Sequence, residues 1–454
     1  MRSPLNKRLF RELRGEFGKY LVIFILMTLT IGMVSGFLVA DGSMIQAYEE
    51  SFEKYSIENG HFRTEKKMNN AQIQDIEDLG IKLYENYYVE EALTNGSTMR
   101  IFKNRDEVNK VCLMKGKMPE KPGEIGIDRM YADNNDLSVG DEIESGGHTW
   151  KITGLVALSD YSALFSNNND SMFDSVKFGV SVVCPEEFDS YKADQLNYSY
   201  AWKYNTEPKN EKAEKDISED LMEDVAKEVT LEEFVPRYTN QAIIFTGDDM
   251  GGDRSMMIVL LYIIIVIMAF VFAITTSNTI RKEANVIGTL RASGYTRGEL
   301  IRHYMAAPVF VTFIGAIIGN IIGYTVGKDY CAGLYYGSYS LPTYVTIWNA
   351  EAFLLTTVVP ILIMLVVNSV LLWYKLKLSP LKFLRRDLSR RKQKHALPLS
   401  EHLGFFRRFR IRVILQNMSN YAVLFVGIIF ASFIFVFGLI MQPTIDKYME
   451  ITKD

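Results

Sequence analysis

The chain has 454 residues, a mean hydropathy of +0.02 and 23% charged residues, averages that suit a soluble protein of several domains. Its apolar residues are nevertheless concentrated in runs without Asp, Glu, Lys or Arg: residues 20–40, 255–280, 304–327, 352–374 and 413–445. Each run reaches the roughly 20 residues that a helix needs to cross a bilayer, which argues against buried helices of a soluble protein. We therefore predict an α-helical membrane protein with five spanning helices and an extracytoplasmic mixed α/β domain between the first two.

The net charge of −4 conceals an asymmetry between the polar segments. Three polar segments are strongly basic: together, residues 1–19, 281–303 and 375–412 hold 24 Lys and Arg but only 6 Asp and Glu. The remaining polar segments hold 26 Lys and Arg and 48 Asp and Glu. Cytoplasmic loops carry an excess of Lys and Arg, so the three basic segments are expected inside. The prediction is a multi-pass protein of the cell membrane with a cytoplasmic N-terminus, and with residues 41–254, 328–351 and the short tail 446–454 outside.

The N-terminal segment 1–19 places apolar side chains at helical spacing among basic residues. This pattern indicates a cytoplasmic amphipathic helix on membrane lipid, although a basic flank that only sets the topology remains an alternative. The run 20–40 is too long for the core of a cleaved signal peptide. Within it, Gly32 and Gly36 form a pair of small residues that allows close helix packing. Helical spacing continues beyond Asp41, which predicts a stalk.

The extracytoplasmic region 41–254 is predicted to hold helices and short strands. Residues 70–79 and 211–227 have helical patterns, whereas 142–144, 149–156, 176–184 and 198–204 are strand-like, with a hairpin signal at Gly146 and Gly147. The acidic segment 211–227 is interpreted as a solvated face, with binding of a cation or basic peptide as the alternative. The polar, glycine-rich segment 247–253 is expected to return the chain to the membrane.

Little in the sequence indicates chemistry. The chain has no phosphate-binding loop, no catalytic triad and no His and Cys spacing of a metal site, so we predict no catalytic, cofactor or metal residues and no nucleic-acid partner. The runs lack the ionisable residues typical of ion-coupled transporters and channels. Cys112, Cys184 and Cys331 are all expected outside, where a Cys112–Cys184 disulfide and three free thiols both remain open.

The segment 255–385 contains the features of greatest interest. Its loop 281–303 carries apolar residues on one face of a short helix, which could enter a groove on a cytosolic protein or lie on lipid. The following run has glycine at every fourth position, which indicates close helix packing or, alternatively, flexibility. The fourth run contains Pro360, expected to kink it, and Asn368, expected to bond across helices. The packing residues that we predict are Gly32, Gly36, Gly315, Gly319, Gly323 and Gly327.

Residues 256–385 resemble the FtsX-like permease family, the membrane subunits of MacB-type ABC transporters. Residues 287–295, Ile-Gly-Thr-Leu-Arg-Ala-Ser-Gly-Tyr, are similar to the family's Ile-Gly-x-Leu-Arg-Ala-x-Gly-x, and the glycine-spaced helix and Leu-Ser-Pro-Leu-Lys-Phe-Leu-Arg at 378–385 add to the likeness. Segments 115–119, 123–125 and 139–141 resemble the family's periplasmic domain more loosely. The acid that often precedes Ile-Gly is replaced by Val286, and the nearest acid is Glu283.

The resemblance implies a permease that couples ATP hydrolysis by a separate cytosolic ATPase to movement of its outer domain. Such proteins export or release peptide, lipid or lipoprotein substrates or give antimicrobial-peptide resistance, and the chain itself is then not an enzyme. The residues that the resemblance assigns to ATPase coupling are Ile287, Gly288, Leu290, Arg291 and Gly294. The alternative is a signalling or scaffold protein that controls an extracellular wall hydrolase or a sensor kinase without transport.

The end of the chain repeats features of its beginning. After the basic cytoplasmic linker 386–412, the run 413–445 resembles the run 20–40 in its position, its basic flank and its aromatic start. This repetition favours the first half of a tandem, ten-span permease, in which a second permease unit lies in the same chain. A natural five-span protein that pairs as a homodimer is the alternative.

Overall fold

The computed structural model describes residues 14–386, 388, 404–416 and 418–451, so the expected helix 1–19 and linker 386–412 lie largely outside the described residues. The chain divides into two compact units, one of Met1–Ile265 with Ala307–Met364 and one of Val266–Ala306 with Leu365–Asp454. Among the described residues, four helical stretches are long and apolar enough to cross a membrane: Phe17–Lys54, Gln241–Lys282, Arg297–Ser338 and Ala350–Leu376. They correspond to the first four runs of the sequence.

The fifth run belongs to α15 (Met418–Ile451), which follows α14 (Phe405–Gln416). In this stretch only the short helical piece Ala431–Ile440 is identified as apolar among the described residues. Four candidate membrane helices are therefore established by length and composition, and the fifth span stays a prediction.

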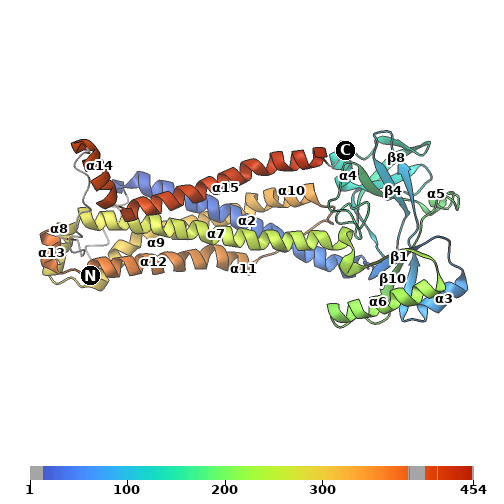
Figure 1. Cartoon of the computed structure of the whole chain (residues 1–454), viewed down its shortest axis with the longest axis horizontal. Coiled ribbons are helices and arrows are strands. Elements are labelled where there is room, and N and C mark those ends of the chain that lie inside the picture. Colours follow the sequence, from blue (N-terminus) through green and yellow to red (C-terminus); the bar gives the residue numbers. More distant parts are fainter. Residues whose placement is uncertain (1–13, 387, 389–403, 417, 452–454) are drawn as a thin grey trace. The chain divides into compact units, whose positions relative to one another are not determined.

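The α/β domain contains two sheets, as drawn in Figure 1. The first is antiparallel, in the order β11 (Leu231–Pro236), β1 (Gly60–Thr64), β10 (Tyr198–Tyr204) and β2 (Ile81–Glu85). Helices α3 (Asn70–Glu77) and α6 (Glu211–Glu228) pack against each other and against its edge strands. The second sheet is mixed, in the order β3 (Tyr88–Ala92), β4 (Thr98–Lys103), β9 (Phe178–Val183), β6 (Glu124–Asp128), β8 (His148–Leu158) and β5 (Val111–Gly116), with β7 (Glu142–Ser145) on β8.

The local patterns of this domain follow from its sequence. Gly146 and Gly147 both have positive φ, +57° and +84°, and join β7 to β8 in the two-residue hairpin that the Gly-Gly pair predicts. The predicted strand 198–204 and helix 211–227 are also confirmed, as β10 and α6. Apolar residues from alternate strand positions fill the core, including the fully buried Trp150 and Trp202. Cys112, Cys184 and Cys331 are buried free thiols, which settles the disulfide question. Helices α4 (Arg129–Asn134) and α5 (Pro185–Phe188) complete the domain.

Residues 247–253, expected to return the chain to the membrane, are helical, and so is part of 328–351, which was expected to be an outer loop. Residues 247–253 lie inside α7 (Gln241–Lys282), where a glycine costs only about 1 kcal/mol. Gly247 accommodates the ring of Tyr48 from α2 (Phe17–Lys54), since a Cβ there would lie 2.7 Å from Tyr48 Cε1, and the Tyr48 hydroxyl donates to the carbonyl of Ile243 at 2.8 Å. This contact accounts for Gly247, whereas a Cβ on Gly251 or Gly252 would meet no atom within 4 Å.

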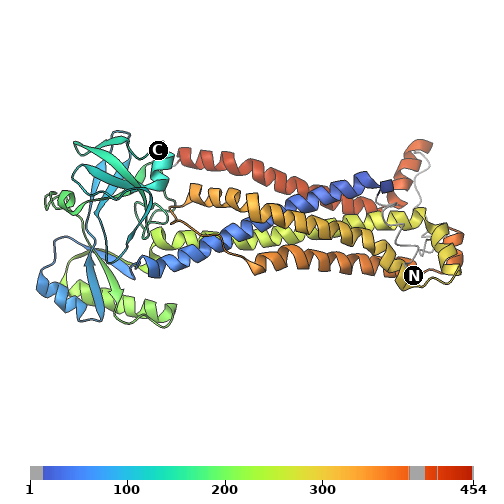
Figure 2. The same ribbon diagram turned by 180° about the vertical axis from the view of Figure 1, so that it is seen from behind.

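The segment 328–351 is likewise only partly a loop. α9 (Arg297–Ile322) continues through a π-helical turn, η2 (Gly323–Gly327), into α10 (Lys328–Ser338), which packs on α2 (Figure 2). An irregular stretch then leads to α11 (Ala350–Phe353), a second π-helical turn, η3 (Leu354–Val358), and α12 (Val359–Leu376), which contains Pro360. The sequence pattern missed α10 because its Tyr and Gly content is typical of a membrane-surface loop.

Candidate coupling site and helix-packing row

The predicted coupling loop begins at a break after α7. Glu283 leaves helical geometry with φ −94° and ψ 15°, and α8 (Ala284–Ala292) starts directly after it. The carboxylate of Glu283 accepts a hydrogen bond from the Tyr304 hydroxyl at 2.6 Å, which ties this break to the first part of α9. The acid that the sequence places nearest to the family's acidic position is thus engaged within the chain.

Helix α8 packs on α13 (Pro380–Leu384), the short helix after α12. Gly288 permits this contact, because a Cβ there would lie 2.8 Å from Leu384 Cγ and 3.0 Å from the Leu384 backbone nitrogen. The buried cluster beneath draws on five elements, which are α7, α8, the start of α9, the end of α12, and α13 with the residues just before it. Its buried members are Ile280, Ala284, Ile287, Leu300, Tyr304, Leu372, Leu376, Leu378 and Phe383.

Arg291 joins α8 to the end of α12. Its guanidinium donates to the carbonyl of Leu376 at 3.0 Å and to that of Leu378 at 2.5 Å. The Leu376 carbonyl is the last of α12 and that of Leu378 lies two residues beyond, where backbone acceptors lack helical partners and a positive charge is favourable. Burial and the neighbouring charge of Arg297 lower the pKa of Arg291, but an arginine stays charged at neutral pH.

Gly294 ends the coupling helix. Its φ of +95° lies in the left-handed region that favours glycine, and the Tyr295 N–H donates to the carbonyl of Leu290 at 3.1 Å. Thr296 and Glu299 then cap α9 reciprocally: the Glu299 carboxylate accepts from the Thr296 N–H at 2.8 Å and the Thr296 hydroxyl accepts from the Glu299 N–H at 3.3 Å. Gly294 therefore ends α8, and the capping box directly after it starts α9.

The side chains predicted as the apolar anchor are placed differently from the expectation. Ile287 is fully buried in the chain's own cluster, and Leu290 is half-buried against it. Helical spacing suggested an apolar face, but it could not show that α13 already covers that face. Val286, which departs from the family's pattern, is an exposed large apolar side chain of α8, with 42% of its surface accessible.

The glycines of α9 and η2 lie against α2. A Cβ on Gly319 would lie 2.9 Å from Ile31 Cβ and from the Thr28 carbonyl oxygen, and one on Gly323 would lie 2.7 Å from the Gly32 carbonyl oxygen. Of the opposing glycines on α2, Gly36 is equally crowded, since a Cβ there would lie 2.6 Å from the Gly327 carbonyl carbon, whereas one on Gly32 would lie 3.2 Å from the Gly319 carbonyl oxygen. Gly315 is less crowded, with Met27 Cβ at 3.3 Å. The structure therefore brings all six predicted packing glycines to one helix contact.

The sequence did not predict a role for Asn320, which lies among the glycines of α9 and η2. Buried Asn320 accepts from the hydroxyls of Ser35 at 2.9 Å and Thr356 at 2.8 Å, and donates to the Thr357 hydroxyl at 2.9 Å and the Ala316 carbonyl at 2.8 Å. These bonds join α2, α9 and η3. Asn368, predicted for a similar role, is also buried. The signal for Asn320 was available, since an amide in an apolar run needs a partner.

The α/β domain contacts the end of α10 and the residues that follow it. Arg129 of α4 donates to the carbonyls of Tyr336 at 2.8 Å and Tyr339 at 2.7 Å, and Asp128 accepts from the Ser340 hydroxyl. Asp128 also caps α4 by accepting from the Met130 N–H at 2.8 Å. No sequence motif indicated this contact, because its partners are about 210 residues apart along the chain.

Four helices suited to cross a membrane, with an α/β domain between the first two, define a multi-pass membrane protein. Residues 258–380 match the family described as FtsX-like permease C-terminal, whose members are membrane components of ABC transporters. The match covers α8 and its surroundings and confirms the resemblance found in the sequence.

The crystal structure of the periplasmic region of MacB from Actinobacillus actinomycetemcomitans is similar over 37% of this chain and 85% of its own. Its sequence identity is 12% and its TM-score 0.22, too low to define a shared fold. No curated protein sequence matches the chain significantly.

Proposed function

We propose that this permease receives the movement of a separate cytosolic ABC ATPase at α8 and passes it to the α/β domain outside. The observation that carries the proposal is the buried cluster around α8, in which α7, α9 and α12 meet α8 and α13. A displacement of α8 would therefore act on three candidate membrane helices together. Each of these helices runs continuously from the unit that holds α8 into the unit that holds the α/β domain.

The rigidity of the α8 region supports a mechanical role. Gly288 lets α13 lie directly on α8, and Arg291 binds the last carbonyls of α12, so α8 cannot shift without α12 and α13 following. Packed elements of this kind move as bodies, because close-packed interiors have low compressibility. In this proposal Gly288, Arg291 and Gly294 hold the coupling element together, and Val286 faces the ATPase.

At the other end, the α/β domain has the contacts needed to follow the helices. Arg129 and Asp128 hold the segment after α10, and the Ser162 hydroxyl donates to the carbonyl of Ala242 at 3.0 Å at the start of α7. We expect movement of the domain to release or export a substrate at the outer face. A peptide, lipid or lipoprotein is the class of substrate that the family resemblance implies.

The test replaces Val286 by Asp and purifies the full chain from its native membranes. A charged side chain at a buried apolar contact is strongly unfavourable, so recovery of the copurifying ABC ATPase should fall at least about tenfold. The matched control is Val176→Asp, a similarly exposed valine in the α/β domain with 51% of its surface accessible. The control should retain the ATPase. Unchanged recovery with Val286→Asp, or absence of any ATPase from the unaltered preparation, would contradict the docking proposal.

A further inference from the structure

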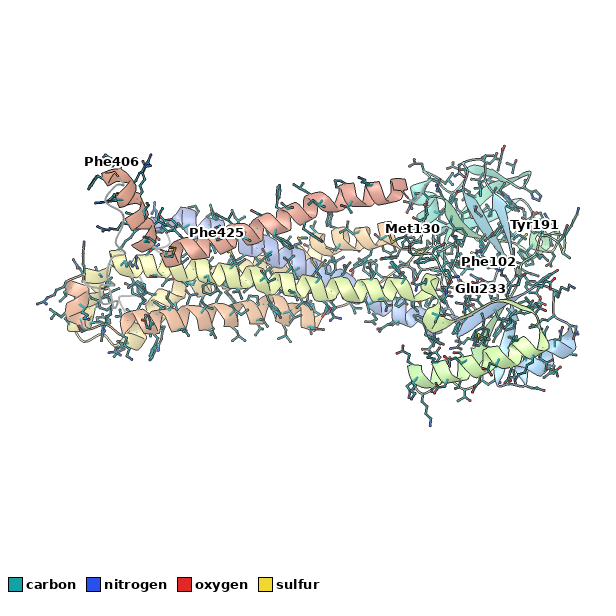
Figure 3. The ribbon with its side chains drawn as sticks, viewed as in Figure 1. Phe102, Met130, Tyr191, Glu233, Phe406 and Phe425 are labelled. Carbon is teal, nitrogen blue, oxygen red and sulfur yellow. The ribbon has the colours of Figure 1, made fainter. Side chains whose placement is uncertain are left out.

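A cavity of about 490 Å³ lies between the two sheets of the α/β domain. Strand β1 contributes His61 and Arg63 to its wall, and β4 contributes Arg100 and Phe102. Each pair consists of alternate residues of one strand, whose side chains point to the same face of the sheet. Figure 3 labels Phe102 and Glu233, which belong to opposite sheets and both line the cavity. Facing sheet surfaces ordinarily join in an apolar core. Charged residues at the inward positions of both strands indicate a polar binding space.

The inner end of the cavity is occupied by charges that neutralise one another. Glu58 Oε1 lies 2.5 Å from His61 Nδ1, and Glu58 also accepts from the Asn109 amide at 2.6 Å. Although burial disfavours the charged ring, the Glu58 carboxylate raises the pKa of His61 above its ordinary value. Asp160 is paired with the Arg105 guanidinium through two hydrogen bonds of 2.6 and 2.7 Å. Apart from Arg105 Nε, which has no hydrogen-bond partner, these groups are paired within the protein and need no ligand.

Arg100 is held rigidly on the cavity wall. Its guanidinium donates to the Glu90 carboxylate at 2.9 and 2.6 Å and to the Tyr161 hydroxyl at 2.6 Å. The guanidinium carbon also lies 4.5 Å from the ring centre of Tyr88 and 5.0 Å from that of Phe178. A guanidinium fixed in this way positions the Glu90 carboxylate, whose side chain remains partly exposed. Fixed polar groups bind a ligand without the entropy cost of ordering them.

Two cations of the wall are less completely satisfied. Arg63 Nη1 lies 3.3 Å from Glu232 and donates to Asn197 Oδ1 at 3.4 Å, whereas its Nε lies 3.7 Å from Glu233 and is buried without a hydrogen-bond partner. A separation of 3.7 Å is too long for a hydrogen bond. Within the described residues, Lys177 forms no ion pair. Arg63 and Lys177 can therefore bind a carboxylate, and Glu90, which Arg100 engages through Oε1 alone, can bind an ammonium.

We propose that this cavity binds a small zwitterion of the α-amino-acid type. Its volume falls within the range of about 300–1,000 Å³ found for ligand pockets, and its wall presents carboxylates, basic groups and aromatic rings together. A zwitterion can engage the basic groups Arg63 and Lys177 and the partly exposed Glu90 carboxylate at the same time. The inference concerns the α/β domain alone and does not depend on ATPase docking at α8.

The test is calorimetric titration of the purified full chain at neutral pH with three probes of matched shape. L-phenylalanine carries both charges, phenethylamine lacks the carboxylate, and 3-phenylpropionate lacks the ammonium. Because a hydrogen bond to a charged group contributes substantially to binding, L-phenylalanine should bind at least about tenfold more tightly than either analogue. The dipeptide Gly-Phe carries the same charges farther apart and distinguishes a free amino acid from a peptide.

Variants of the two cations assign the carboxylate site. Arg63→Gln should remove the preference for L-phenylalanine over phenethylamine while keeping the preference over 3-phenylpropionate. Lys177→Gln, on an exposed segment with little effect on folding, should weaken the same preference and serves if Arg63→Gln fails to fold. Lys192→Gln, which lies outside the cavity wall, is the control and should bind as the unaltered chain does.

The proposal fails if L-phenylalanine shows no saturable binding or if the three probes bind equally. Either result would mean that the cavity is filled by water and that its charged side chains pair only to stabilise the fold. Tighter binding of Gly-Phe than of L-phenylalanine would overturn the amino-acid assignment in favour of a peptide.

Discussion

At the scale of single residues, Asp128 is a titratable group in the contact between the α/β domain and Ser340. Burial raises its pKa to about 6, against the opposing effects of the Ser340 hydroxyl, the backbone N–H groups of α4 and Arg129. A raised carboxyl pKa means that the folded protein binds a proton more tightly than the unfolded chain. The associated stability is complete below the unfolded pKa of 3.8 and is lost as the pH rises through about 6.

Replacing Asp128 by Asn should remove this pH dependence. Asn stays neutral and is as good a helix N-cap as Asp, so the variant should gain thermal stability relative to the unaltered chain as the pH rises from about 5 to 7. Thermal unfolding midpoints of both proteins across this range provide the measurement. Asp194→Asn, at an exposed acid outside this contact, should show no such trend. A constant difference between Asp128→Asn and the unaltered chain would contradict the assignment.

The residue scale also shows how far the sequence could predict the coupling site. The motif at 287–295 located α8, and Gly294 correctly marked its end because a left-handed residue at a helix terminus is commonly glycine. The burial of Ile287 could not be predicted, since it results from α13, which lies nearly 100 residues later in the chain. Periodicity identifies an apolar face but not the element that covers it.

At the scale of elements, the contact of α2 with α9 and η2 gives a clear prediction. Gly319→Leu should lower the stability of the helix assembly by about 1–3 kcal/mol, because its Cβ alone would lie 2.9 Å from Ile31 and Thr28. Ile318→Leu is the matched control, since Ile318 is exposed on the neighbouring face of the same helix. Thermal unfolding of both variants in detergent is the measurement. Equal midpoints would favour flexibility over packing as the role of the glycines.

The elements themselves were predicted unevenly. Long apolar runs and alternating strands have strong local patterns, so α2, α7, β8 and β10 were expected near their observed positions. The π-helical turns η2 and η3 and the helical course of 247–253 were not expected. Both depend on tertiary contacts: Asn320 joins α2, α9 and η3, and Gly247 receives Tyr48. Such contacts override weak local preferences.

At the scale of the whole molecule, the orientation across the membrane is the prediction on which the proposed function depends. The charge distribution places the α/β domain outside and α8 inside, since Lys and Arg concentrate in the loops on one side. Single cysteines introduced at Asn169, in the α/β domain, and at Ser293, at the end of α8, report on the two sides. Both positions are exposed, whereas the native Cys112, Cys184 and Cys331 are buried and should react slowly.

A membrane-impermeant thiol reagent added to intact cells should label Asn169→Cys and leave Ser293→Cys unmodified until the membrane is permeabilised. Ser338→Cys, at the exposed end of α10, should behave as Asn169→Cys does, because an odd number of membrane crossings separates each of these positions from α8. Labelling of Ser293→Cys in intact cells would reverse the orientation. Val286 would then face away from the cytosol, and a cytosolic ATPase could not act on α8. The same experiment therefore tests the topology and the physical requirement on which coupling rests.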